Sequence, residues 1–179
     1  DFSTYVDMSV LTEELCGLSR PVHFRGVCTV VNKLFNIVTP DHAYFGQKDG
    51  QQLAVIKRMV RDLNMDIEIV GCPIIREEDG LAKSSRNTYL SSEERKAALI
   101  LSKTVALGKE LAKTEKDANK VVEAMKKNIE TEPLAKIDYV EAVDALSMAP
   151  VEKLEGTCML AMAVYIGKTR LIDNTLINE

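Results

Sequence analysis

The sequence lacks tryptophan altogether and contains only four cysteines and two histidines among its 179 residues. The cysteines are Cys16, Cys28, Cys72 and Cys158. They are far apart and match neither a zinc-binding nor a redox-active spacing, and His23 and His42 add no ligand cluster. We therefore expect no metal held by protein ligands, and we interpret the cysteines as reduced thiols of a cytoplasmic protein.

Long apolar runs, blocks of like charge and two common enzyme motifs are also missing. No apolar run approaches the ~20 residues of a membrane span, and the first residues have no basic-then-apolar signal pattern. The net charge is −4 with both signs interspersed, which argues against nucleic-acid binding. Neither GxxxxGKS/T nor GxSxG occurs, which excludes a P-loop enzyme and a hydrolase with a nucleophile elbow. We expect neither a membrane nor a nucleic acid as partner.

Apolar residues, in contrast, are plentiful. They make up 46% of the chain, which is enough to bury a substantial core. The chain opens with DFSTYVDMSV, without an initiator methionine, and this stretch has the pattern of a strand followed by a turn. We expect the sequence to be a piece of a longer protein.

The first part of the chain has the alternation of strand and helix that is typical of a parallel sheet. A buried helix that ends at Pro40 is predicted by apolar residues at helical spacing: Val27, Val30, Val31, Leu34, Phe35 and Val38. Residues 42–45 then read as a strand, residues 53–63 as a helix and residues 67–71 as a second strand. Such a βαβ unit has parallel strands, and its ligands lie at their carboxyl ends.

The pattern changes after Pro73. Ser91 and Glu94 have the spacing of a capping box, which starts a predicted helix that runs to about Thr114. Asp117 is the expected cap of another helix. Three strands are predicted from apolar runs at residues 137–143, 158–166 and 169–177, with a turn at 167–168.

We therefore predict an α/β fold with two domains. Residues 1–75 are expected to form the second half of a Rossmann-like domain with a parallel sheet. Residues 76–179 are expected to form a small α+β C-terminal domain with antiparallel strands.

Residues 45–52, FGQKDGQQ, lie between the first predicted strand and the helix that follows it. Free amides at a helix start attract an anion, Gly46 permits close approach of the backbone, and Lys48 adds a positive charge. These features predict a cradle for a phosphate or a nucleotide. Asp49 and Gln52 are also spaced almost as in a capping box, so an ordinary helix start explains the pattern about equally well without excluding the cradle.

The segment LAKSSRN, residues 81–87, brings together Lys83, Ser84, Ser85 and Arg86. An arginine binds phosphate oxygens through two parallel hydrogen bonds, and hydroxyls complete the shell, so this loop has the composition of a lid over a triphosphate. Serine, arginine and asparagine are also frequent in solvated loops, and on spacing alone that explanation is somewhat favoured.

Arg20 and His23 stand just before the first predicted helix, where they would suit a carboxylate or phosphate in a substrate pocket. A structural histidine is the more common explanation when no partner is in view.

Five segments, in order, resemble one enzyme family: SRPVHFRGVCTVVNKLFNIVTPD, YFGQKDGQQL, IVGCPIIRE, DGLAKSSRNTYLS and RLIDN. They resemble the pantothenate synthetases, the pantoate–beta-alanine ligases of vitamin B5 and coenzyme A biosynthesis, over essentially the whole chain. The resemblance implies that ATP activates pantoate as an acyl adenylate with loss of pyrophosphate, and that beta-alanine then displaces AMP. It also implies a homodimer and a nucleotide-binding domain followed by a lid domain. We expect Mg²⁺ because the departing pyrophosphate needs its charge neutralised.

The resemblance assigns roles to individual residues. It implies ATP binding by Gly46, Gln47, Lys48, Asp49, Ile75, Lys83, Ser84, Ser85 and Arg86. Gln52 matches the glutamine that holds pantoate, and Lys48 and Arg86 are the expected catalytic residues. Gln47 and Lys83 depart from the family, which usually has glutamate and an apolar residue there. Lys83 would either add a phosphate contact or point to solvent.

One family segment does not occur among these residues: Met-Gly-Ala-Leu-His-x-Gly-His, whose histidines bind the phosphates and assist adenylation. Because loss of one such group can cost about 10²–10³ in rate, we expect this chain alone to be nearly inactive. Two alternatives stay open. One is a related nucleotidyl transferase with another acceptor, and the other is a non-catalytic module that binds nucleotide or dimerises.

Overall fold

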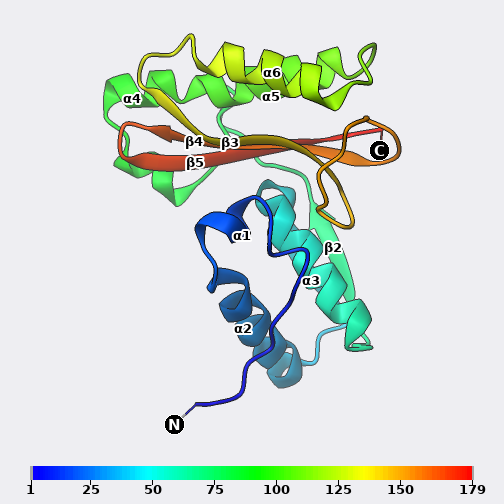
Figure 1. The fold of residues 1–179 in the computed structure, drawn as a ribbon. Helices are drawn as coiled ribbons and strands as arrows, with labels where there is room; N and C mark the ends of the chain where they lie inside the picture. The colour runs from blue at the N-terminus through cyan, green and yellow to red at the C-terminus, as the bar shows by residue number, and fades with distance from the viewer. Residues whose placement is uncertain (1, 179) are drawn as a thin grey trace. The chain divides into compact units, whose positions relative to one another are not determined.

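The structure is a computed structural model that describes residues 2–178, and of Ser19 only the backbone. It has a parallel two-stranded sheet followed along the chain by an antiparallel three-stranded sheet, with helices accompanying both (Figure 1). The predicted α/β class is therefore confirmed. The chain divides into two compact units. Unit 1 runs to Pro73 and includes Leu146–Ala149, and unit 2 consists of Ile74–Ala145 and the residues from Pro150 onward.

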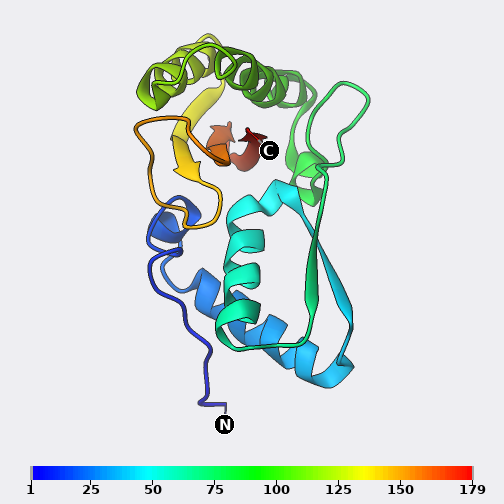
Figure 2. The same cartoon turned by 90° about the vertical axis from the view of Figure 1, so that its right-hand side faces the viewer.

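The sheet of unit 1 is the predicted βαβ unit. Strand β1 (His42–Gly46) pairs in parallel with β2 (Glu68–Cys72), and α3 (Gly50–Asp62) connects them through the short 3-10 helix η1 (Gln47–Asp49). The helix packs against both strands, as Figure 2 shows, because its apolar stripe faces them. The register pairs Gly46 with Cys72, so both strands end at the same edge of the sheet.

Helix α2 (His23–Val38) differs from the prediction in burial. The sequence pattern predicts a buried helix, but only one face is covered, with Phe24, Cys28 and Phe35 inside. The other face exposes Val30, Leu34, Ile37 and Val38, and Ile37 is 74% exposed. Helical spacing identifies the apolar residues correctly, but it cannot tell whether a second element covers them.

The residues before α2 also differ from the prediction. Residues 2–9 form no strand and pair with neither β1 nor β2. Side chains hold the segment instead: the Thr29 hydroxyl accepts a hydrogen bond from the amide of Val6 at 3.0 Å. Turns then lead into the four-residue helix α1 (Cys16–Ser19).

Unit 2 is a helix layer on an antiparallel sheet. Strands β3 (Ala135–Asp144), β4 (Cys158–Ile166) and β5 (Thr169–Ile177) lie in this order, and α5 (Leu99–Leu111) and α6 (Ala118–Ile129) cover one face (Figure 1). The strand β4 is buried along almost its whole length. The predicted turn joins β4 to β5 through Gly167, whose φ of +57° is the left-handed conformation that glycine adopts without strain.

The helix starts of unit 2 confirm the predicted caps. Ser91 and Glu94 form a capping box before α4 (Ser92–Ala97), and the Asp117 carboxylate accepts two backbone amides at the start of α6. The helix expected to run from the capping box to about Thr114 is wrong in one respect. It is interrupted at Ala98, where α4 ends and α5 begins, although no proline or glycine marks the break in the sequence.

Candidate functional site

The loop after β1 lies where the sequence pattern predicts a nucleotide cradle. Gly46 ends the strand, η1 turns the chain, and α3 begins at Gly50. A parallel sheet presents its ligand-binding loops at this carboxyl edge, and the first turn of α3 adds the positive end of a helix dipole. The loop therefore lies where parallel sheets commonly bind anionic ligands.

Gly46 is a glycine that the fold itself does not require. Its φ of −71° and ψ of 132° suit any residue, and a Cβ placed on it would meet no atom within 4 Å. It is also exposed. Neither strain nor packing therefore explains a glycine here, whereas close approach of a ligand to the backbone would.

The polar residues that follow Gly46 have different surroundings. Gln47 and Lys48 are half-buried, and both interact with neighbouring groups. Asp49 is exposed and occupies the N-cap position of α3, but its side chain makes no capping hydrogen bond. The interpretation of Asp49 and Gln52 as a capping box is therefore wrong, because the Asp49 side chain accepts no amide hydrogen bond at the helix start.

Two adjacent glutamines at the start of α3 have opposite environments. Gln51 is buried, accepts a hydrogen bond from the amide of Cys16 at 3.0 Å, and donates to the carbonyls of Leu11 at 2.9 Å and Glu14 at 2.7 Å. Gln52 is half-buried, and its amide has no hydrogen-bond partner within the part of the chain that the structure describes. Gln51 therefore holds the fold together, and Gln52 is available to a ligand.

The second set of predicted residues lies on a hairpin of unit 2. The amide of Lys83 donates to the carbonyl of Ile75 at 2.9 Å, and the amide of Glu77 donates to the carbonyl of Leu81 at 2.8 Å. Gly80 permits the turn with a φ of +94°. The structure thus brings together Ile75 and Lys83, two predicted ATP-binding residues that are separated in sequence.

The residues of the predicted lid, Lys83 to Arg86, are mostly exposed. Ser84 caps the 3-10 helix η2 (Ser85–Tyr89), where its hydroxyl accepts the amide of Arg86 at 3.2 Å. The Arg86 guanidinium has no ion-pair partner among residues 2–178, and Lys83 lies 3.8 Å from Glu77 in a loose pair. Both cations are accessible to an anion from solvent.

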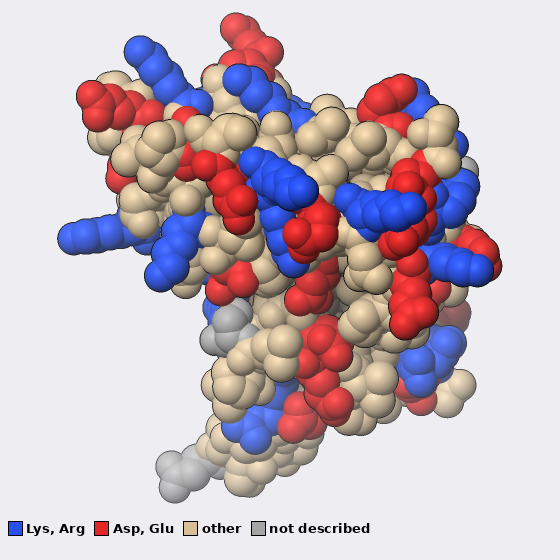
Figure 3. Space-filling view, turned by 45° about the horizontal axis from the view of Figure 1, so that its top comes forward, with Lys and Arg blue, Asp and Glu red and all other residues tan. Residues whose placement is uncertain are grey.

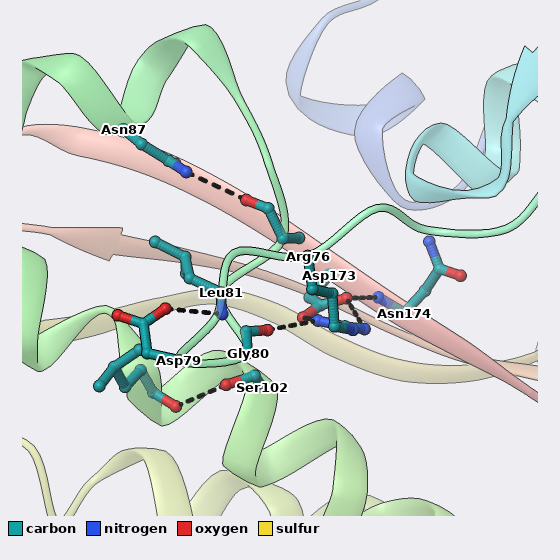
Figure 4. A network of polar contacts seen from close by, with 10 residues as sticks. Arg76, Asp79, Gly80, Leu81, Asn87, Ser102, Asp173 and Asn174 are labelled. Carbon is teal, nitrogen blue, oxygen red and sulfur yellow. Dashed lines mark hydrogen bonds and ion pairs between the residues drawn. The ribbon is translucent and has the colours of Figure 1, made fainter.

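An ion pair that no sequence pattern indicates lies at the base of this hairpin. The Arg76 guanidinium makes two hydrogen bonds to the Asp173 carboxylate of β5, at 2.7 and 3.0 Å (Figure 4). Arg76 also donates to the carbonyl of Gly80 at 3.1 Å. The segment RLIDN contains Asp173, but only the fold shows its partner.

Arg20 and His23 lie at the start of α2. Arg20 is exposed, and the amide of His23 donates to the carbonyl of Arg20 at 3.0 Å in a turn. The His23 ring packs near Phe24, with 5.1 Å between ring centroids. These contacts agree with a structural position for His23.

Two hollows in unit 1 lie away from the predicted residues. One is lined by Phe35, Thr39, Asp41 and Ile67, at the amino ends of β1 and β2 and so opposite to the cradle. The other is lined by Asp7, Arg58 and Asp62, among others. The Arg58 and Arg61 guanidiniums lower the pKa of the Asp62 carboxyl through hydrogen bonds.

The described residues contain no group of three or more histidine, cysteine, aspartate or glutamate side chains that could hold a metal ion. Within the same range, no helix has the length and apolar character needed to cross a bilayer. Figure 3 shows basic and acidic side chains interspersed on the face in view, and Lys126–Glu123 is one of the surface ion pairs of unit 2.

Comparison with known proteins gives a consistent result. The model of the Pantoate-beta-alanine ligase family matches residues 2–176. A pantothenate synthetase from Ruminiclostridium cellulolyticum is 66% identical over 97% of this chain and 62% of its own length. A crystal structure of pantothenate synthetase from Thermus thermophilus superimposes with a TM-score of 0.92 and 41% identity, covering 97% of this chain and 63% of that one.

A third similar protein was solved with ligands. The pantoate-beta-alanine ligase from Francisella tularensis, complexed with beta-gamma ATP and beta-alanine, has a TM-score of 0.69 and 32% identity. The match covers 97% of this chain and 58% of that one. The chain thus spans about three fifths of the length of the relatives that it matches.

Proposed function

This chain belongs to the pantoate-beta-alanine ligase family, and we propose that it supplies ATP-binding and pantoate-binding residues for the joining of pantoate to beta-alanine. The reaction would run through a pantoyl adenylate, with pyrophosphate and then AMP as leaving groups. The ligand-bound relative from Francisella tularensis supports ATP and beta-alanine as substrates, since it was solved with beta-alanine and an ATP compound.

The observation that carries this proposal is the open backbone at Gly46. A glycine that neither the backbone angles nor the packing requires is best explained by a ligand that comes close to the main chain. Asp49 and Gln52, whose side chains are not used by the fold, flank the same turn. Asp49 would accept hydrogen bonds from the ribose hydroxyls, and Gln52 would bind pantoate.

The cations would act on the phosphates. Charge develops on the pyrophosphate as it leaves, and preorganised positive groups stabilise that charge most effectively. Lys48 beside the cradle and Arg86 in the lid are proposed for this role. The binding of ATP would be completed by Gly46, Gln47, Ile75, Lys83, Ser84 and Ser85, with Ile75 contributing its backbone.

Magnesium would enter as part of the substrate. Mg²⁺ is usually held by phosphates, waters and one or two carboxylates rather than by a protein cage. The triphosphate and water would therefore supply most of the ligands of the ion. The ion would neutralise charge on the triphosphate, and the residues named above would orient it.

The remaining assignments are also proposals. Residues 1–75 would be the C-terminal part of the nucleotide-binding domain, and residues 76–179 the lid domain. A homodimer in the cytoplasm is the expected working form. Arg20 and His23 are the weakest candidates for the substrate pocket, because backbone and ring contacts within unit 1 already account for His23.

ATP titration of two glycine variants tests the cradle. We expect Gly46→Ala to weaken ATP binding at least tenfold, which corresponds to about 1.4 kcal/mol, because a methyl group would occupy the path of the ligand. Its stability should not change, since the Cβ meets no atom. Gly26→Ala is the matched control, because Gly26 is equally open but lies within α2. Unchanged ATP affinity in Gly46→Ala would contradict the cradle.

Pantoate-dependent exchange of labelled pyrophosphate into ATP tests the chemistry. We expect the 179-residue chain to exchange very slowly, because neither of its two histidines lies in a His-x-Gly-His segment. Fast exchange by this chain would show that the histidine motif is dispensable. A chain that fails to bind ATP at all would refute the proposed function for these residues.

A further inference from the structure

We propose that the Arg76–Asp173 pair is a positioning device that fixes the backbone of the lid residues Lys83 to Arg86. The inference rests on the proposed function in one respect only, namely that these residues bind a polyphosphate. The anchoring itself is a statement about unit 2 and is tested separately below.

The Arg76–Asp173 pair fixes the relative orientation of its two side chains as well as neutralising their charges. Two guanidinium nitrogens of Arg76 meet the two carboxylate oxygens of Asp173 at 2.7 and 3.0 Å, in the parallel arrangement that fixes both planes. The Asp173 side chain is only 1% exposed. The Arg76 side chain is 30% exposed, so the pair is partly buried. A bidentate pair on a buried carboxylate holds a defined geometry, which a loose surface pair does not.

The hairpin transmits this geometry to the lid. Arg76 pairs across the hairpin with Ala82, and the backbone hydrogen bond from Lys83 to Ile75 flanks that bridge. A third hydrogen bond from Arg76 reaches the carbonyl of Gly80 in the turn. Arg76 thus holds the turn and β5 at once (Figure 4), and Lys83 follows directly after the residue that pairs with Arg76.

Asn87 closes the other end of the lid. Its side-chain amide donates to the carbonyl of Ala82 at 3.1 Å, so residues 83–86 form a loop whose two ends are tied together. Ala82 therefore takes part in both contacts, the bridge to Arg76 and the hydrogen bond from Asn87. A shift of the hairpin relative to β5 would move every lid residue with it.

A contribution to stability alone does not explain why this partly buried ion pair stands here in place of apolar residues. Apolar side chains of similar volume usually replace such pairs with little loss of stability, because burying the charges is costly. Breaking one partner, in contrast, leaves an unpaired buried charge and is strongly destabilising. A double apolar replacement therefore removes the directional contact while keeping the packing.

The test compares two double variants of the 179-residue chain. The first is Arg76→Met with Asp173→Leu. The matched control is Arg170→Met with Asp138→Leu, which removes another partly buried arginine–aspartate pair of unit 2, one that joins β5 to β3. Each is assayed by thermal unfolding, by amide hydrogen exchange at Lys83, and by titration with ATP and Mg²⁺.

We expect the first variant alone to speed exchange of the Lys83 amide. It should also weaken ATP binding roughly tenfold to a hundredfold, since losing a hydrogen bond to a charged phosphate has an effect of this size. Arg76→Lys, which keeps the charge but loses the fork, should lie between it and the wild type. If the double variant does not fold, Arg76→Lys is compared with the wild type in the same assays.

Three outcomes would overturn the inference. The first is unchanged Lys83 exchange in the Arg76 variants, and the second is unchanged ATP affinity when the wild type binds. The third is an equal effect in the Arg170 control, which would indicate general loosening. If the wild type binds no ATP, the proposed function is wrong, and the exchange data alone decide whether the pair anchors the loop.

Discussion

The two units differ in how they dispose of their apolar side chains. Every residue of the hydrophobic core cluster belongs to unit 2, where α5 packs on β4 and β5 and α6 packs on β3. Fifteen large apolar side chains are exposed in the described part of the chain, and only Ile75, Tyr89 and Leu134 of these belong to unit 2. Unit 2 therefore covers its apolar residues more completely, whereas unit 1 has both a smaller core around α3 and an apolar surface.

The number of strands explains much of this difference. Two strands and one covering helix bury little area, whereas three strands under two helices enclose a continuous core. An exposed apolar face such as that of α2 is typical of a surface that packs against something else. Candidate ligand-binding residues occur in both units, so they are not confined to the unit with the larger core.

The largest effect is expected from a cavity in the core of unit 2. Leu160 lies in β4 with no exposed area, so Leu160→Ala should lower the free energy of unfolding by about 2–5 kcal/mol. Urea unfolding followed by circular dichroism measures it. Leu134→Ala is the control, because Leu134 is 42% exposed and should change the value far less. Equal losses of unfolding free energy in both variants would contradict a tightly packed core in unit 2.

A pair of helical glycines compares the units directly. A Cβ on Gly108 would lie 2.6 Å from the Met125 sulfur and 3.0 Å from a Leu160 methyl, and both residues are buried. Gly108→Ala should therefore destabilise the chain by about 1–3 kcal/mol through overpacking. Gly26→Ala meets nothing and should stabilise by about 0.5–1 kcal/mol, because alanine favours helix. The same sign for both variants would refute the comparison.

Sequence patterns identified most elements of the fold because they reflect local physics. The limits of β4 and the caps at Ser91 and Asp117 follow from apolar runs and from side chains that bond to nearby amides. The uncovered face of α2 did not follow, because helical periodicity records which residues are apolar but not what lies opposite them.

The candidate site was predicted in part. The position of the Gly46 turn follows from the order of strand and helix. Gln51 and Gln52 are identical neighbours, so only the fold shows that the first is tied to Leu11 and Glu14. Arg76 and Asp173 are 97 residues apart, and no local pattern connects them.

Buried thiols report on each unit separately. Burial, with a smaller effect of Asp7, raises the pKa of Cys28 to about 11, and burial raises the pKa of Cys158 in unit 2. Both should resist alkylation at pH 8 until the surrounding structure opens, while the half-buried Cys16 and Cys72 react first. We expect Cys28 to react roughly tenfold faster than Cys158, because unit 1 buries less apolar area.

Alkaline pH adds a second measurement on Cys28. A thiol with a raised pKa in the folded state stabilises the fold below its ordinary value of 9.0 and loses that contribution as the pH rises toward about 11. Unfolding midpoints measured from pH 8 to 11 should fall, and less so in Cys28→Ala. Faster alkylation of Cys158 than of Cys28 would contradict our expectation that unit 1 opens more readily than unit 2.

The apolar face of α2 should contribute little to the stability of the chain itself. Replacing Leu34 and Ile37 by glutamine should change the free energy of unfolding by less than about 0.5 kcal/mol each, since both side chains are exposed. Self-association, measured by sedimentation at rising concentration, should decrease because the apolar patch is smaller. A large loss of stability would show that this face is covered in the free chain.

The smallest effect concerns a surface contact of unit 2. The Arg95 guanidinium donates to Asp79 at 2.9 Å and lowers the pKa of its carboxyl below the ordinary value of 3.8. Its stabilising contribution is therefore present above pH 3.8 and is lost as the pH falls through the lower folded value. Because Asp79 also accepts the Leu81 amide, the NMR shift of that amide should titrate below pH 3.8.

Asp79→Asn should abolish that titration and leave the unfolding midpoint at neutral pH unchanged, because exposed ion pairs add little to stability. The hairpin would then depend on the partly buried Arg76–Asp173 pair, and the core of unit 2 on its apolar contacts. A clear drop of the midpoint in Asp79→Asn would mean instead that the surface of unit 2 contributes as much as its core. That result would weaken the contrast with unit 1, which exposes most of the large apolar side chains that lie on the surface of the described chain.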